Sequence, residues 1–251
     1  MESKNPFFKS KSFTNTSAAN DHARVIDYNE TMSVQGTINK SFILLLLLVT
    51  TAVFTWTLAF SGYNPMLLTI GGAIVGLILV VISSFKPHLS VYLAPAYAAF
   101  EGLFIGGISA FFEAKYPGLV IQAVGGTFVT FIVCFALYKY NIVKVTEKFK
   151  SVVVAATLAI AAYYLISWLL SMFTSFMPVH YGNSMMSIGI SVFVIVIAAL
   201  NLFLDFDNIE KGAQERMPKY MEWYSAMGLM VTLVWLYIEF LRLLSKLSSR
   251  D

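Results

Sequence analysis

Apolar residues dominate the chain after residue 40 and fall into seven stretches that are separated by short polar segments. A helix needs about 20 predominantly apolar residues to cross the hydrocarbon core of a bilayer. Each of the seven stretches meets this requirement, so we predict an all-α protein with seven transmembrane helices. The predicted spans are 41–60, 65–85, 91–112, 118–139, 151–173, 185–206 and 222–244.

Small and polar residues recur along one face of each of the last two predicted helices. Steps of three and four residues keep side chains on one helix face. We expect both faces to contact protein or water rather than lipid, and we expect the acid in each to carry the function. The first series is Ser187, Ser191, Val194, Ala198, Asn201 and Asp205, and the second is Ser225, Gly228, Thr232, Trp235, Glu239, Arg242 and Lys246.

The composition supports an integral membrane protein. Of the 251 residues, 58% are hydrophobic and only 12% are charged, whereas soluble domains carry about 25% charged residues. We predict a flexible polar tail at 1–40, without a cleaved signal, and one membrane domain at 41–251. The net charge of +3 gives no nucleic-acid signal. One cysteine, Cys134, and three scattered histidines offer no metal site, so we expect no metal and no cofactor.

The distribution of basic residues predicts the orientation. Thirteen Lys and Arg residues lie on the side of the N-terminus and four on the opposite side, which places the N-terminus in the cytoplasm. The C-terminus is then outside, where Arg242, Lys246 and Arg250 run against the rule. A re-entrant last segment would remove this exception, but the segment is long enough to cross, and we favour crossing.

Glycine pairs occur in three consecutive spans, at 71–72, 106–107 and 125–126. Glycines spaced by four residues let helix backbones approach closely. We therefore predict that the second, third and fourth spans pack against one another. The first span, rich in leucine and aromatic residues, is expected to face lipid.

Acids inside the spans restrict the chemistry. An ionised carboxylate at a helix centre costs roughly 2.5–3.5 kcal/mol, so each acid must be protonated, share a proton, pair with a base or hold a cation. Oxygen ligands also suit Ca²⁺, and protons or Ca²⁺ are thus the expected regulatory or permeant ions. The candidates are Asp205, Glu239 and Glu101, with Asn201, Asn208, Arg242 and Asp207 in support.

Structural interpretations of the same acids stay open. Glu239 and Arg242 could form an ion pair near a helix end, and Glu101 could be a protonated acid bonded to a carbonyl group. Asp207 points away from Asp205 and precedes Lys211 by four residues, which favours a solvated ion pair. An enzyme is not expected, because no span contains the histidine that a serine hydrolase needs.

Four segments together resemble the Bax inhibitor-1/YccA family, in its bacterial Bax inhibitor 1-like branch. They are Leu-Asp-Phe-Asp-Asn-Ile at 204–209, Leu-Tyr-Ile-Glu at 236–239, MSVQGTINKSFILLLL at 32–47 and GLVIQAVGGTFV at 118–129. The resemblance implies a seven-helix bundle with a central last helix in the cell membrane of a prokaryote. It also implies a pH-sensitive Ca²⁺ leak in which Asp205 and Glu239 are the paired acids.

The spacing of this pair departs from the family. If the last span starts at Glu222 beside Asp205, Glu239 lies roughly 25 Å further along the helix. Either residues 208–226 form a surface or re-entrant segment, or the partner of Asp205 is Glu101. An alternative function is a non-conducting regulator that binds and modulates membrane proteases or stress factors; the polar tail, which a channel does not obviously need, supports it.

Overall fold

The computed structural model describes residues 31–174, 178, 182 and 184–249. Most of the predicted polar tail, residues 1–30, lies outside this described part. Within it the chain forms seven long helices, one short 3₁₀ helix and no β-strand. The elements are α2 (Val34–Phe60), α3 (Met66–Phe85), η3 (Pro87–Leu89), α4 (Ser90–Lys115), α5 (Leu119–Lys139), α6 (Glu147–Phe173), α7 (Met185–Gln214) and α8 (Met221–Ser248).

The all-α prediction with seven spans is confirmed, because all seven long helices are apolar and long enough to cross a membrane. Several helices begin where the sequence supplies a cap. The side chains of Ser33, Thr146 and Ser184 each accept a backbone N–H from the first turn of α2, α6 and α7, which satisfies a donor that has no partner inside the helix.

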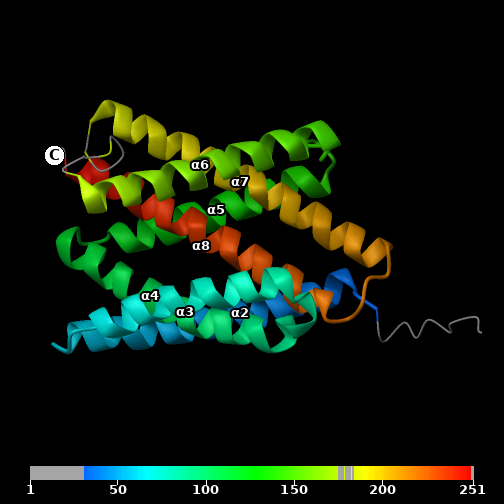
Figure 1. The fold of residues 1–251 in the computed structure, drawn as a ribbon, viewed down its shortest axis with the longest axis horizontal. Helices are drawn as coiled ribbons and strands as arrows, with labels where there is room; N and C mark the ends of the chain where they lie inside the picture. The colour runs from blue at the N-terminus through cyan, green and yellow to red at the C-terminus, as the bar shows by residue number, and fades with distance from the viewer. Residues whose placement is uncertain (1–30, 175–177, 179–181, 183, 250–251) are drawn as a thin grey trace, which may run out of the picture. The chain divides into compact units, whose positions relative to one another are not determined.

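Helix α8 is the centre of the bundle, as the resemblance implied. It packs against α7, α2, α4 and α5, and Figure 1 shows it running between α2, α3 and α4 on one side and α5, α6 and α7 on the other. The side chains of Leu236 and Leu241 on α8 are completely buried, as is that of Leu202 on α7. An apolar helix in the middle of a bundle therefore carries residues that do not face lipid.

Close backbone contacts join α4 to both α2 and α3. A Cβ atom at Gly102 or Gly106 would collide with the carbonyl oxygen of Leu48 or Ala52 on α2, and one at Gly72 would lie 2.5 Å from the carbonyl oxygen of Phe100. The predicted packing of the second and third spans is thus confirmed. The expectation that α2 only faces lipid is wrong, because one of its faces packs along α4.

The predicted place of the fourth span is also wrong in part. Gly125 of α5 faces open space, and Gly126 lies against the ring of Phe240 on α8. Helix α5 packs mainly on α8 and α7 rather than on α3 and α4. The glycine pair alone could not show this, because the same dipeptide suits a helix contact and an open surface equally well.

Candidate functional site

The two polar faces predicted on α7 and α8 lie against each other. At one end, the Lys246 ammonium group donates to the backbone oxygen of Ser187 at 3.2 Å and to the hydroxyl oxygen of Ser191 at 2.7 Å. At the other end, Thr232 of α8 faces the carboxyl group of Asp205. The prediction that these faces contact protein is therefore confirmed.

The register between α7 and α8 corrects one expectation. Helix α7 continues to Gln214, and α8 starts at Met221, so residues 208–226 form no separate surface or re-entrant segment. Because the two helices run antiparallel from this turn, Asp205 lies beside Gly228 and Thr232 and not beside Glu222. Glu239 is seven residues beyond Thr232, or about 10 Å along the axis.

Asp205 lines a polar cavity of about 450 Å³ between the end of α3, the end of α7 and the start of α8. Its Oδ2 atom is buried and has no hydrogen-bond partner in the described part of the chain, and the same holds for Oγ of Ser83, another residue of the lining. Buried polar atoms almost always have partners. Two such atoms in one cavity indicate a place for a proton, water or a cation.

Glu239 has a different environment from Asp205. Its side chain is buried, and one carboxylate oxygen accepts hydrogen bonds from Arg242 at 3.1 Å and from the Tyr164 hydroxyl group at 3.2 Å. The interpretation as an ion pair near the helix end is confirmed.

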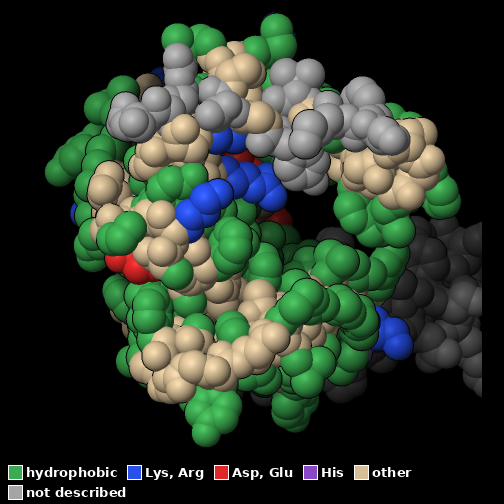
Figure 2. All heavy atoms as spheres, turned by 90° about the vertical axis from the view of Figure 1, so that its left-hand side faces the viewer, with side chains coloured by type: hydrophobic (Ala, Val, Ile, Leu, Met, Phe, Trp, Pro, Cys, Tyr) green, Lys and Arg blue, Asp and Glu red, His purple; other side chains and the backbone are tan. Residues whose placement is uncertain are grey.

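Figure 2 looks at the end of the bundle where α8 finishes and shows basic side chains gathered beside a hollow.

Glu101 forms a third, separate position. It is buried on α4 against α3, where a Cβ atom added to Gly76 would lie 2.6 Å from its Oε2 atom. Tyr97, one turn earlier on α4, is buried as well. Within the described residues, no hydrogen bond or ion pair joins any two of Asp205, Glu239 and Glu101.

The supporting residues divide between two environments. Asp207 forms ion pairs with Lys211 at 2.9 Å and with Lys150 of α6 at 2.8 Å. The predicted Lys211 partner is correct, but Asp207 is buried rather than solvated. Asn201 donates to the Thr157 hydroxyl oxygen of α6 at 2.8 Å and thus turns away from the cavity, whereas Asn208 is exposed and lines it.

Comparison with known protein families now identifies the chain. A family described as Bax inhibitor 1 like matches residues 5–249. The protein belongs to the Bax inhibitor 1 like family. The match spans α2 to α8 and confirms the resemblance seen in the sequence. No curated protein matches the chain.

Sequence reasoning did not single out Glu222, whose carboxylate has more bonded partners than the other acids of the membrane helices in the described part of this Bax inhibitor 1-like chain. One carboxylate oxygen accepts from the backbone N–H and the hydroxyl group of Ser33, both at 2.9 Å. Lys219 lies 2.9 Å from the same oxygen, and Lys40 pairs with the other. Only Lys219 is near in sequence, and its spacing of three residues is the one signal that could have pointed to Glu222.

These environments allow different chemistry. Asp207, Glu222 and Glu239 each have at least one basic partner, which offsets their charge. Asp205 has no ion pair among the described residues, and the cavity that it lines is also lined by Lys211 and Glu215. Among the described residues, no group of three or more His, Cys, Asp or Glu side chains could hold a metal ion.

Proposed function

We propose that this Bax inhibitor 1-like protein is a passive, pH-sensitive cation leak of the cell membrane, with Ca²⁺ as the most suitable ion. The observation that supports this most is the buried, unpartnered carboxylate oxygen of Asp205 beside a polar cavity. Thr232 is a neutral hydrogen-bond donor to Asp205, and a buried carboxylate oxygen that still lacks a partner either binds a proton or attracts a cation. Proton binding and cation passage thus compete at one atom.

The cavity belongs to the cytoplasmic side in this proposal. It lies where α3 and α7 end and α8 begins, which is the side of the loops that are rich in Lys and Arg. The positive-inside rule assigns that side to the cytoplasm. Asp205 then responds to the cytoplasmic pH.

The oxygen atoms around Asp205 suit a hard cation. Ser83 and Asn208 line the same cavity, as do Glu215 and Lys211, whose ammonium group is paired with Asp207. Carboxylate, amide and hydroxyl oxygens are the ligands that Ca²⁺ accepts. One carboxylate with few neutral oxygens binds weakly, and weak binding permits an ion to leave again. When Asp205 is protonated, this attraction is lost. The leak is therefore small at low pH and rises as the pH increases.

Glu239 and Glu101 have secondary roles in this mechanism. Arg242 lies 3.1 Å from Glu239, so the charge of Glu239 is offset whether or not a cation passes. Glu101 faces α3, the helix that also contributes Ser83 to the cavity. It can act only through a shift of α3, and we assign the pH response to Asp205 first.

Ion flux into liposomes tests this proposal. Purified protein is reconstituted in vesicles that contain a Ca²⁺-sensitive dye, and the initial rate of Ca²⁺ entry is measured between pH 5 and pH 8 (roughly the range in which a perturbed carboxyl group titrates). We expect the rate to rise with pH in the wild type. Asp205→Asn, which fixes the neutral form, should remove this rise.

Glu147→Gln is the matched control, because the Glu147 side chain is 86% exposed and does not line the cavity. It should keep the wild-type response, and Glu239→Gln should keep most of it.

A pH response that is unchanged in Asp205→Asn would reject the mechanism. Absence of flux at every pH would favour the non-conducting regulator; the polar tail that supports that alternative lies mostly outside the described residues.

A further inference from the structure

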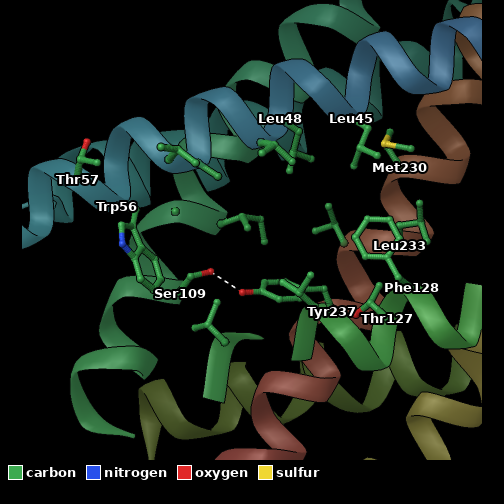
Figure 3. A pocket seen from close by; sticks show the side chains of 18 residues that line it. Leu45, Leu48, Trp56, Thr57, Ser109, Thr127, Phe128, Met230, Leu233 and Tyr237 are labelled. Carbon is green, nitrogen blue, oxygen red and sulfur yellow. Dashed lines mark hydrogen bonds between the residues drawn. The ribbon is translucent and has the colours of Figure 1, made fainter. Parts of the chain in front are cut away.

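A long apolar groove runs between α2 and α5, with α8 as its floor. It consists of two cavities of about 570 and 350 Å³ that share part of their lining. Figure 3 shows the larger one, with side chains of α2 on one side and of α5 and α8 on the other. The residues common to both cavities are Leu45, Phe128, Met230 and Leu233.

The groove opens toward the region that the bilayer occupies. Val49 and Val53 on α2 and Phe128 on α5 line it and are about half exposed. On α5 the lining extends from Val120 to Tyr138, about 27 Å of helix at 1.5 Å per residue. The hydrocarbon core of a bilayer is about 30 Å thick, so the groove follows most of its depth.

Apart from Thr127, whose hydroxyl group donates to the backbone oxygen of Ala123 in its own helix, the polar side chains that line the groove lie toward its two ends. At one end, the hydroxyl groups of Ser109 and Tyr237 form a hydrogen bond of 2.6 Å, near Trp56 (Figure 3). At the other end, Tyr138 donates a hydrogen bond to Glu210. Glu210 is the one charged side chain among the described residues that line either cavity. This pattern of an apolar middle and polar ends matches the cross-section of a bilayer.

We propose that this groove binds a membrane phospholipid such as phosphatidylethanolamine. An acyl chain lies along α8, and the ammonium group of the headgroup lies beside Glu210. The shape and the charge of the groove favour a phospholipid: its apolar lining follows most of the depth of the hydrocarbon core, and its charged side chain lies at one end only. The exposed carboxylate at the groove end complements the ammonium group of this zwitterionic headgroup and disfavours a headgroup with a net negative charge. The proposal does not depend on the cation leak.

Native mass spectrometry of the full-length protein tests the binding. The protein is incubated in vesicles of phosphatidylethanolamine and phosphatidylglycerol in equal amounts, and the phospholipid retained after mild detergent extraction is identified. We expect retained phosphatidylethanolamine in the wild type. Leu45→Trp places a large ring in the groove and should reduce retention about tenfold, equivalent to about 1.4 kcal/mol. Leu46→Trp is the control on the neighbouring, 72% exposed position that does not line the groove, and it should retain lipid normally.

The headgroup and the position are tested separately. Glu210→Gln should still retain lipid but without preference for phosphatidylethanolamine. A phospholipid with a photoreactive acyl chain should label Leu233 on the floor of the groove in the wild type and not in Leu45→Trp. Equal retention by Leu45→Trp and Leu46→Trp, labels confined to outward-facing residues, or cross-links to a second copy of the chain would each overturn the proposal.

Discussion

At the scale of single residues, the buried acids differ in how their charge is satisfied. Glu222 has two lysines and two donors from Ser33, and Glu239 has an arginine. Asp205 has no basic partner in the described chain; Thr232 is its neutral neighbour, and its Oδ2 atom, like Oε2 of Glu239, has no hydrogen bond there. A carboxylate paired with a base stabilises a fold, whereas a buried one without a charged partner is retained at a cost. We therefore assign a structural role to Glu222, which joins α8 to the start of α2, and a functional role to Asp205.

The role of Glu222 can be measured through stability. It joins the start of α8 to the start of α2, and its side chain is completely buried. Glu222→Gln keeps the shape but removes the charge that holds Lys40 and Lys219. Breaking a buried ion pair costs about 3 kcal/mol or more; because both lysines are partly exposed, we expect a loss of about 2 kcal/mol in the free energy of unfolding.

Thermal unfolding in detergent checks this prediction. The control is Glu147→Gln, which removes an exposed pair with Lys150 and should change stability by less than about 1 kcal/mol. Similar unfolding temperatures for Glu222→Gln and the wild type would show that the Glu222 contacts do not hold α2 and α8 together.

At the scale of helices, glycines decide which backbones approach each other. Neighbouring glycines on α3 differ completely in this respect. A Cβ atom at Gly72 would lie 2.5 Å from the Phe100 oxygen of α4, while Gly71 has nothing within 4 Å. Helix α4 is held between α2 and α3 by such contacts, with Gly102 and Gly106 facing α2. Small residues therefore fix the positions of α2, α3 and α4.

Leucine substitutions at the neighbouring glycines test this view. Gly72→Leu should lower the thermal stability in detergent by about 1–3 kcal/mol, because it forces α3 away from α4. Gly71→Leu should be neutral or slightly stabilising, because leucine is a better helix former than glycine. Equal effects of the two substitutions would show that Gly72 is not a close contact.

At the scale of the whole membrane domain, α8 is an unbroken helix from Met221 to Ser248. Its length and hydropathy suit a full crossing of the membrane. Two of its basic residues bond to other groups of the bundle. Arg242 pairs with Glu239, and Lys246 donates to Ser187 and Ser191. These two residues therefore need not be counted as loop charges, and the exception to the positive-inside rule becomes small.

Reporter fusions test the resulting topology. Fusions at residues 141–145 and 215–219, within the loops before α6 and α8, should report a cytoplasmic location. Fusions at residues 62–64 and after residue 250 should report the outside. The opposite result at 141–145 would reverse the whole arrangement, and a cytoplasmic C-terminus would show that α8 does not cross.

The sequence alone was sufficient for the seven spans and the fold class, because length and hydrophobicity of a span are local properties that the bilayer imposes on each helix separately. It also placed the polar faces of α7 and α8 correctly, since a spacing of three and four residues fixes a helix face. The family resemblance rested on short segments such as 204–209 and was confirmed by the match to residues 5–249.

Only the tertiary structure decided which helices are neighbours and which acids have partners on other helices. Lys40 and Glu222 are 182 residues apart, and nothing local marks them as a pair. The extension of α7 to Gln214 sets the register that places Asp205 beside Thr232 and leaves Glu239 with Arg242. Such pairings depend on how whole helices are positioned by contacts along their length, as at Gly72 and Gly102. The pattern of one helix carries no information about the face that a distant helix presents to it.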